Sequence, residues 1–232
     1  MVSGVSGPRV GVLSLQGDYA RHRASLEALG ASVTRVTLPR DLAGLDALVM
    51  PGGESTTMVR MIESAGLRGP LADFVRSKPV LGTCAGVILL GRETGGLPGP
   101  TFGVLDLTVE RNAYGRQIDS FEAEIEAPVV GGTFHGVFIR APRLARIGPG
   151  VEVIARRGRG AALLVGRAAA SGEPVGVRAG NVVGLCFHPE LTSDLRFHRW
   201  FLIDVAGLRL PAVESSASGA APISEQTSGG RR

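Results

Sequence analysis

The 232-residue chain is poor in the residues that build disulfide-linked, metal-bound or membrane-spanning proteins. It has two cysteines, 5% aromatic residues and a single lysine, Lys78. Two cysteines form no disulfide framework, and without a C-x-x-C motif there is no pattern for a zinc or dithiol site. No apolar run reaches the roughly 18 residues of a membrane span, and residues 1–8 lack a signal-peptide pattern. We therefore expect a cytoplasmic protein with no metal and no membrane contact.

Positive charge comes almost entirely from arginine. The formal net charge is +4 and the pI is about 9.8. Arginines such as Arg143, Arg146 and Arg157 are not interleaved with aromatic side chains, so we interpret them as a solvated face and predict no nucleic-acid partner. Hydrophobic residues make up 44% of the chain and mean hydropathy is +0.20, which is enough for a buried core.

Strands and helices alternate in the first part of the chain, which predicts a parallel sheet with helices on both faces. The expected strands are 9–15, 32–36, 46–50 and 78–81, and the expected helices are 18–29, 56–65 and 71–77. From residue 105 the pattern changes to a series of strands, which we expect at 105–111, 120–126, 133–139, 151–155, 162–165, 174–177 and 182–186. A final helix is expected at 193–206. The predicted fold class is α/β, a three-layer sandwich around a mixed, mostly parallel sheet.

The segment Gly82-Thr83-Cys84-Ala85-Gly86 has the pattern of a nucleophile elbow. It follows an apolar run and precedes a helical one, and its small residues permit a sharp strand-to-helix turn that holds Cys84 out from the backbone. The helix start also places partial positive charge near the sulfur, which favours thiolate. The alternative is that Cys84 is a small core residue.

A histidine and an acid lie far downstream in Phe187-His188-Pro189-Glu190. In an extended backbone, residues i and i+2 point to the same side, so Glu190 can orient the imidazole of His188 while His188 deprotonates Cys84. A lone histidine is more often structural. The joint occurrence of these groups, each at a predicted strand end, favours a catalytic triad.

The loop Pro51-Gly52-Gly53-Glu54-Ser55 completes the predicted site. The N–H of Ala85 is the natural first oxyanion donor, and the backbone at Gly53 is the natural second. Glu54 suits a substrate ammonium group. Arg111 and Arg140 suit a carboxylate, although taken singly each is better explained on sequence alone as a surface arginine. An amino acid with an acyl group for the cysteine to attack points to glutamine.

These residues resemble the class I (triad) glutamine amidotransferases over about residues 10–201, and within that family the vitamin B6 branch. The elbow and the His-Pro-Glu segment are shared across many glutaminases. The resemblance also includes Ser14-Leu15-Gln16-Gly17. The branch is indicated by the Gly-Gly-Glu-Ser-Thr-Thr, Glu-Arg-Asn and Phe-Ile-Arg-Ala-Pro sequences, which lie in Pro51-Gly52-Gly53-Glu54-Ser55-Thr56-Thr57, Val109-Glu110-Arg111-Asn112-Ala113-Tyr114-Gly115-Arg116-Gln117 and Gly136-Val137-Phe138-Ile139-Arg140-Ala141-Pro142.

The resemblance implies a flavodoxin-like glutaminase domain, which we expect over 9–210. Residues 1–8 are expected to form a flexible arm, and the Ser-, Gly- and Pro-rich composition of 211–232 predicts a disordered tail; both depart from the family pattern. It implies hydrolysis of L-glutamine through a thioester on Cys84, without a cofactor. The substrate would be held by Gly52, Gly53, Glu54, Arg111, Ile139 and Arg140.

The resemblance also implies a partner. Ammonia would pass to a synthase subunit with a (β/α)8 barrel that makes pyridoxal 5'-phosphate. Because the Gly52-Gly53 peptide can flip at little steric cost, we expect activity to rise on partner binding, with Gln16 at the contact that biases the flip.

Two competing interpretations remain at this point, namely a glutaminase or γ-glutamyl hydrolase for another acceptor, and an inactive interaction protein on the same scaffold. The Glu-Ser-Thr-Thr sequence argues against the first, and the intact triad argues against the second. Of the remaining candidates we expect Cys186 in the core, His22 and His198 exposed on helices, and no role for His135.

Overall fold

The computed structural model describes residues 7–113, 120–158 and 172–211. Its strands are β1 (Arg9–Leu13), β2 (Ser32–Val36), β3 (Ala47–Met50), β4 (Val80–Thr83), β5 (Gly91–Thr94), β6 (Leu105–Glu110), β7 (Ser120–Ala127), β8 (Gly132–Ile139), β9 (Arg143–Ile147), β10 (Glu152–Arg157), β11 (Pro174–Ala179) and β12 (Val182–Leu185). Its helices are α1 (Tyr19–Ala28), α2 (Ser55–Ser64), α3 (Arg68–Ser77), α4 (Ala85–Leu90) and α5 (Arg196–Trp200). Short turns of 3-10 helix, η1 (Pro39–Leu42), η2 (Pro128–Val130) and η4 (Pro189–Leu191), and a π-helical turn, η5 (Phe201–Val205), complete it.

A nine-stranded mixed sheet forms the centre of the molecule, in the order β2-β1-β3-β4-β12-β11-β10-β7-β8. The strands from β2 to β12 run parallel, and each pairing from β12 onward to β8 is antiparallel. The parallel part comes from the segments joined by helices, because a parallel pair needs a crossover connection. This confirms the predicted α/β fold with a mixed sheet. The strand expected at 162–165 lies outside the described residues.

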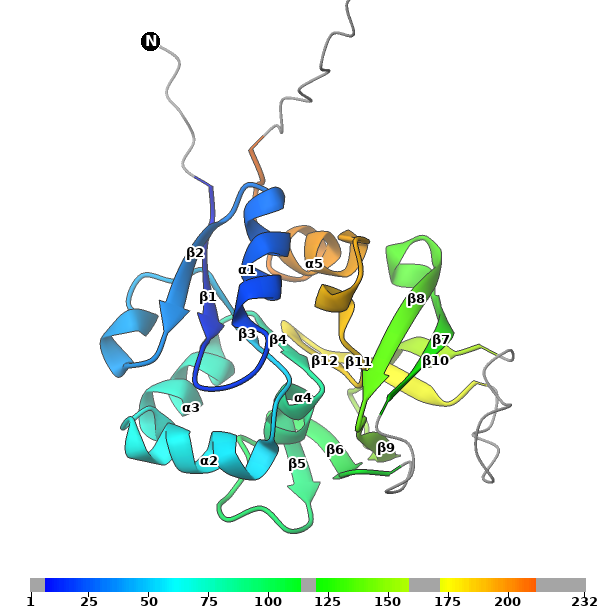
Figure 1. The fold of residues 1–232 in the computed structure, drawn as a ribbon, viewed down its shortest axis with the longest axis horizontal. Coiled ribbons are helices and arrows are strands. Elements are labelled where there is room, and N and C mark those ends of the chain that lie inside the picture. The colour runs from blue at the N-terminus through cyan, green and yellow to red at the C-terminus, as the bar shows by residue number, and fades with distance from the viewer. Residues whose placement is uncertain (1–6, 114–119, 159–171, 212–232) are drawn as a thin grey trace, which may run out of the picture.

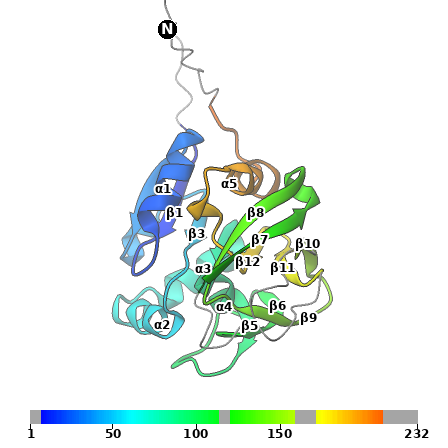
Figure 2. The same cartoon turned by 45° about the vertical axis from the view of Figure 1, so that its right-hand side comes forward.

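Helices cover both faces of the sheet, so the molecule has three layers (Figures 1 and 2). α1 packs beside α5 on one face, and α2 packs against α4 on the other. The final helix is shorter than expected. It begins at Arg196 and continues from Phe201 as the π-helical turn η5.

A second sheet has three strands in the order β5-β6-β9. The strand expected at 105–111 is β6, whereas β5 and β9 were not predicted. β5 follows α4 directly, and two of its four residues are exposed charged side chains, so no apolar alternation marks it. In β9, exposed Arg143 and Arg146 interrupt the pattern in the same way. These arginines form ion pairs with Glu110 and Asp106 of β6, at 2.9 and 3.0 Å. Cross-strand charge pairs thus join β9 to β6, which itself keeps the alternation of buried apolar and polar residues.

Five phenylalanines in the described part of the chain are almost fully buried, and they fill the core between the antiparallel strands and α5: Phe134, Phe138, Phe187, Phe197 and Phe201. Cys186 is buried at 1% exposure beside them, as expected for a core cysteine. Arg157 is also buried, at 4%, which corrects its assignment to a solvated face; its guanidinium pairs with Glu173 at 2.8 Å.

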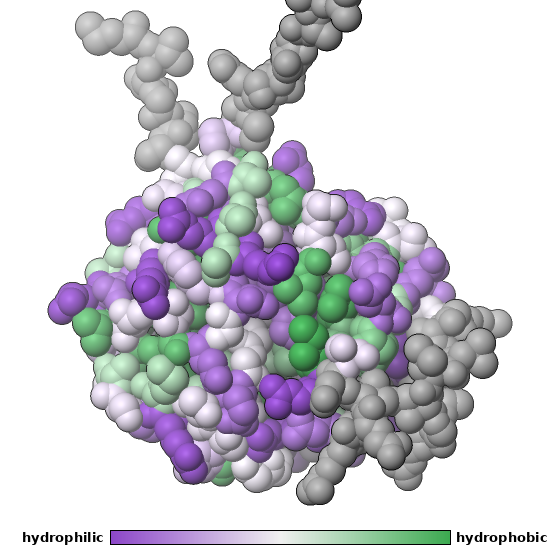
Figure 3. Space-filling model, in the orientation of Figure 1, coloured by the Kyte–Doolittle hydropathy of each residue, from purple (hydrophilic) through white to green (hydrophobic). Residues whose placement is uncertain are grey.

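The outer surface is mixed in polarity. Figure 3 shows hydrophilic residues spread over one face, with a small group of hydrophobic residues right of its centre. In residues 7–113, 120–158 and 172–211, Leu38 is the only large hydrophobic side chain that counts as exposed, at 36%. The same residues contain no helix that is both long enough and apolar enough to cross a membrane.

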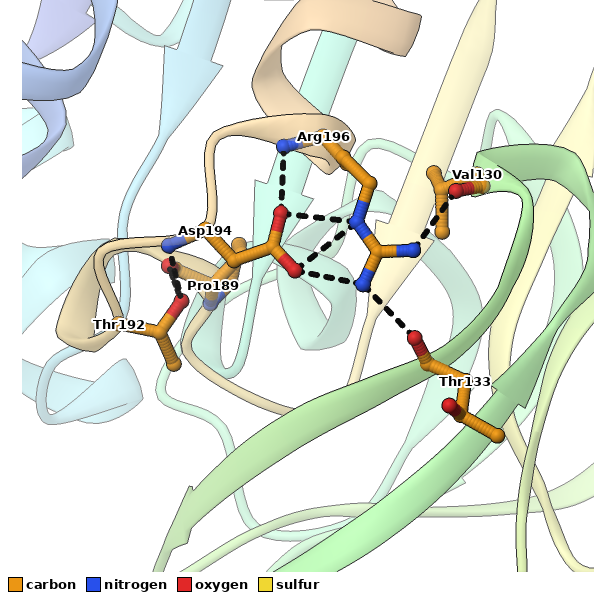
Figure 4. A network of polar contacts seen from close by, with 6 residues as sticks. All are labelled: Val130, Thr133, Pro189, Thr192, Asp194 and Arg196. Atoms are coloured by element: carbon orange, nitrogen blue, oxygen red, sulfur yellow. Dashed lines mark hydrogen bonds and ion pairs between the residues drawn. The ribbon is translucent and has the colours of Figure 1, made fainter.

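A polar network fastens the turn after β12 to the β7–β8 hairpin (Figure 4). The Arg196 guanidinium forms an ion pair with Asp194 at 2.6 Å and donates to the carbonyl oxygens of Val130 and Thr133 at 3.0 and 2.7 Å. The backbone N–H of Asp194 in turn donates to Thr192 Oγ1 at 3.2 Å. The turn that carries Glu190 is therefore tied at its far end to a rigid part of the sheet.

Candidate active site

The predicted site residues follow the carboxyl ends of three neighbouring parallel strands. β3 leads into the 51–54 loop, β4 into Cys84 and β12 into His188, and β4 lies between the other two in the sheet. Ligand sites of open α/β sheets lie beyond this edge. Segments far apart in the chain therefore meet where the sequence pattern predicted.

Cys84 occupies a strained turn between β4 and α4. Its φ is 48° and its ψ is −103°, an unfavourable region for a residue with a side chain. The neighbouring glycines make the turn possible, because a Cβ on Gly86 would lie 2.1 Å from the carbonyl oxygen of Met50 and one on Gly82 would lie 2.8 Å from the carbonyl carbon of Gly86. The turn thus has the geometry of a nucleophile elbow, and the residue in it is buried at 6% exposure.

His188 and Glu190 form the predicted pair. Nδ1 of His188 lies 2.7 Å from Oε1 of Glu190, and the two residues are 6% and 3% exposed. The backbone N–H of His188 donates to the carbonyl of Val137 at 2.9 Å, which anchors the histidine to β8. Burial raises the pKa of the Glu190 carboxyl, but the nearby His22 and His188 outweigh burial and hold that pKa well below its usual range. Glu190 is therefore a carboxylate at neutral pH.

The other ring nitrogen of His188 is available to the cysteine. Nε2 is buried and has no hydrogen-bond partner among the described residues. Burial lowers the pKa of His188, but the nearby Cys84 sulfur and Glu190 together raise it to about 10. The sulfur acts here through its proximity, since it does not form a hydrogen bond of normal geometry with Nε2. An imidazolium beside a sulfur favours thiolate, which is the nucleophilic form.

Gly52 lies against both reactive side chains. A Cβ at this position would lie 2.4 Å from Cε1 of His188 and 3.2 Å from Cβ of Cys84. Gly53 follows with a φ of 147°, and Gln16 Oε1 accepts a hydrogen bond from the N–H of Glu54 at 3.2 Å. The glycine-rich loop is thus in contact with the site on one side and with Gln16 on the other.

Glu54 caps helix α2, a role that sequence reasoning did not assign. Its carboxylate accepts from the backbone N–H groups of Thr56 and Thr57 at 3.0 and 2.7 Å, and from both hydroxyls. Burial raises the pKa of Glu54, but these four hydrogen bonds lower it to about 2. Arg111 Nη2 lies 3.3 Å from Oε1 of the same carboxylate, and its Nη1 donates to the carbonyl of Gly96 at 2.7 Å.

The end of β8 closes the site. Cys84 Sγ lies 3.7 Å from the carbonyl oxygen of Ile139, within reach of a weak S–H donor. Arg140 is exposed and has a φ of 41°, so the chain turns sharply directly beside the sulfur. The structure therefore brings together Cys84, His188, Glu190, Gly52 and Ile139. Arg111 and Glu54 form a neighbouring charged pair.

Two residues near the triad were wrongly predicted to be exposed. His22 and His198 are both 0% exposed, and His22 Nε2 lies 3.2 Å from Oε2 of Glu190. A signal was present, because His22 stands on the same helical face as buried Ser25, Leu26 and Leu29, at spacings of three, four and seven. His135 is largely exposed and pairs with Glu122 at 3.0 Å.

Known proteins similar to this chain give one consistent result. The model of the SNO glutamine amidotransferase family matches residues 12–206. A protein of Deinococcus radiodurans named pyridoxal 5'-phosphate synthase subunit PdxT is 49% identical over 199 residues, which cover 83% of this chain and 95% of that protein. A protein of the same name from Thermus thermophilus is 48% identical over 202 residues, covering 86% and 98%.

Solved structures agree with this. A crystal structure of a glutamine amidotransferase superposes with a TM-score of 0.75 at 45% identity, covering 85% of this chain and 98% of the other. The PurLQS structure from Thermotoga maritima has a TM-score of 0.60 at 18% identity, covering 84% and 98%, and shares the fold.

Proposed function

Because the chain belongs to the SNO glutamine amidotransferase family, we propose that it is the glutaminase subunit of a pyridoxal 5'-phosphate synthase. It hydrolyses L-glutamine to L-glutamate and ammonia, and the ammonia serves vitamin B6 biosynthesis. The observation that carries this proposal is the line from Cys84 through His188 to Glu190 at the ends of adjacent strands.

The reaction begins with attack of the Cys84 thiolate on the side-chain carbonyl carbon of glutamine. A tetrahedral intermediate forms, the C–N bond breaks, and the His188 imidazolium gives its proton to the leaving ammonia. Water then attacks the thioester while neutral His188 accepts its proton, and cleavage of the C–S bond releases glutamate and the cysteine. Glu190, held against Nδ1 at 2.7 Å, keeps the ring in the tautomer that both steps need.

Backbone groups stabilise the negative charge of the intermediate. The N–H of Ala85, first residue of α4, follows the nucleophile directly and is the first donor. The N–H of Gly53 is the second. The loop that presents this N–H group passes close to both Cys84 and His188 at Gly52. A small rotation of the Gly52-Gly53 peptide therefore changes the direction in which the Gly53 N–H points.

The charged groups around the loop bind the amino-acid end of glutamine. Glu54 takes the ammonium group and shares its carboxylate with the cap of α2. Arg111, Arg140 and the backbone of Ile139 supply the remaining contacts, with Arg111 already held 3.3 Å from Glu54. Fixed charges of both signs beside the thiolate suit a zwitterionic substrate.

The partner is a synthase subunit with a (β/α)8 barrel, which receives the ammonia. Gln16 lies in the loop between β1 and α1, is exposed, and accepts from the N–H of Glu54, directly after the oxyanion loop. A partner that moves Gln16 therefore moves the backbone that carries the Gly53 donor. Glutaminase activity is low in the isolated chain and rises when the synthase binds.

The test measures glutamate release with and without the purified synthase subunit. The wild-type chain with partner should turn over at least about tenfold faster than alone, and Gln16→Ala should lose most of that increase. Cys84→Ala should be inactive in both conditions. Cys186→Ala, at a buried core cysteine, is the matched control and should retain activity. Turnover in Cys84→Ala would refute the thioester mechanism; full activity without partner would refute only the gating.

A further inference from the structure

Two buried histidines lie behind the triad, and the reaction as described so far does not use them. His22 comes from α1 and His198 from α5, and both are 0% exposed. Burial of a polar side chain is costly unless its polar atoms find partners. The question is therefore what the two imidazoles bind.

The contacts form a line that ends on Glu190. His22 Nε2 lies 3.2 Å from Glu190 Oε2 and 3.3 Å from Thr83 Oγ1, and His22 Nδ1 lies 3.0 Å from His198 Nε2. The other carboxylate oxygen, Oε1, faces His188. Each oxygen of Glu190 thus faces one imidazole. The contact of His22 Nε2 with Glu190 Oε2 is a close charged contact that lacks the angle of a normal hydrogen bond, and the hydrogen bond of Nε2 runs to Thr83 Oγ1.

The protons on this line can be assigned from charge and geometry. Burial and the nearby His22 lower the pKa of His198 to about 3, although Glu190 opposes this shift. His198 is therefore neutral at pH 7. A bare nitrogen of His22 facing the Glu190 carboxylate would place two lone pairs in contact. His22 Nε2 therefore carries a proton, whether His22 is neutral and accepts from His198 at Nδ1 or is charged and donates to it.

We propose that His22 is a positioning residue of the glutaminase reaction, which fixes the Glu190 carboxylate by holding its protonated Nε2 3.2 Å from the second oxygen, and that His198 in turn fixes the His22 ring. The proposal rests on the triad of the proposed function. It extends the logic of that triad by one step, since His22 orients Glu190 as Glu190 orients His188.

The energetic reason lies in the burial of the carboxylate. Without His22, Oε2 of Glu190 would lose the imidazole that lies 3.2 Å from it and would remain a charged oxygen in the interior without that partner, which is strongly unfavourable. The carboxylate would rotate or take up a proton, and the His188 imidazolium would lose its stabilising charge. Loss of His22 should therefore lower the rate of the chemical step and leave glutamine binding nearly unchanged.

The experiment compares His22→Phe, which keeps a ring of similar size, with His22→Gln, whose amide N–H can still reach Glu190. Glu190→Gln is the positive control, and His135→Gln, at an exposed histidine that pairs with Glu122, is the negative control. Two readouts are taken. One is kcat and KM for glutamine with the synthase subunit present. The other is the pH dependence of Cys84 alkylation by iodoacetamide in the isolated chain, in a Cys186→Ala background.

We expect His22→Phe to lower kcat by about tenfold or more with KM changed less than about threefold, and to move the alkylation profile to higher pH. His22→Gln should recover most of both. An unchanged kcat and profile in His22→Phe, while Glu190→Gln changes both, would overturn the proposal and leave the triad standing. An unchanged profile in Glu190→Gln itself would instead overturn the triad assignment. A folding defect alone would not shift the midpoint of the alkylation profile, and His22→Gln would not reverse it.

Discussion

At the scale of single residues, strain is concentrated at the candidate active site. Among the described residues, the non-glycine residues with positive φ are Cys84, Asn112 and Arg140. Cys84 carries the reactive sulfur, and Arg140 follows Ile139, whose carbonyl oxygen lies 3.7 Å from that sulfur. Asn112 directly follows Arg111 of the charged pair. Such conformations cost about 1–3 kcal/mol each and persist where the surroundings hold them. Here the tight packing of Gly82 and Gly86 is what holds the elbow.

Gly52→Ala should abolish most of the activity while leaving a folded protein. The new methyl group would lie 2.4 Å from Cε1 of His188, so the ring or the loop must move. A displacement of about 1 Å at reacting groups costs about a hundredfold in rate. The measurement is glutamate release with partner present, together with the melting temperature.

The control for this change is Gly69→Ala, because a Cβ there meets no atom within 4 Å. That variant should keep both activity and stability. A Gly52→Ala variant with wild-type turnover would show that the His188 ring can shift without loss, and would contradict the tight fit inferred here.

At the scale of secondary-structure elements, helices carry the site residues from their ends and from one face. α2 begins at the Glu54 cap, α4 begins directly after Cys84, and α1 turns His22 inward along its buried stripe. The helix caps are therefore part of the site. A substitution in one of these caps should therefore change both the free energy of unfolding and the affinity for substrate.

Glu54→Gln should destabilise the fold in a pH-dependent way. Because the folded-state pKa of Glu54, about 2, lies below the ordinary glutamate value of 4.5, the stabilisation by this carboxylate is complete above pH 4.5 and is lost as the pH falls toward 2. The loss of an N-cap costs about 1 kcal/mol, or a melting temperature lower by about 2–4 °C at neutral pH. Calorimetry of wild type and variant between pH 6.5 and 3.5 should show the difference narrowing.

Glu63→Gln, near the other end of α2, is the matched control. Its side chain is 52% exposed and lies 3.9 Å from Arg68, so the substitution should change the melting temperature little at any pH. A difference between wild type and Glu54→Gln that stays constant with pH would mean that the cap does not depend on the charge of the carboxylate.

At the scale of the whole molecule, the described part of the chain consists of the two sheets, the helices that cover the larger one, and a last segment that reaches Pro211. A Cβ on Gly30 would lie 2.4 Å from Pro211 Cγ, so the chain at residue 211 packs against the turn after α1. The sequence assigns residues 1–8 and 211–232 to a flexible arm and a disordered tail. Residues 1–6 and 212–232 lie outside the described part of the chain, and their assignment stays a prediction.

Deletion of residues 213–232 should leave the melting temperature within about 2 °C of the full chain, with unchanged glutaminase activity. The segment contains only two large apolar side chains, Val213 and Ile223, so it can bury little surface to offset the entropy of ordering. Paired melting curves of the two chains test this. A drop of several degrees would show that the tail packs on the domain.

The sequence by itself determined the chemistry. A cysteine between small residues, a His-x-Glu segment and a Gly-Gly-Glu loop, each after an apolar run, predicted which groups would meet, because parallel strands bring their carboxyl ends to one edge. The α/β class followed from the alternation of strands and helices. Local spacing was sufficient for these conclusions, since each depends on a few adjacent residues.

Only the tertiary structure decided which groups surround that chemistry. His22 and His198 are 176 positions apart in the chain, and their contact depends on how α1 and α5 pack over the sheet. The pairing of β5, β6 and β9 likewise brings together segments that no single motif connects, with charged pairs between β6 and β9. Burial and long-range contacts are set by the packing of whole elements. No single motif in the sequence therefore shows that His22 contacts Glu190.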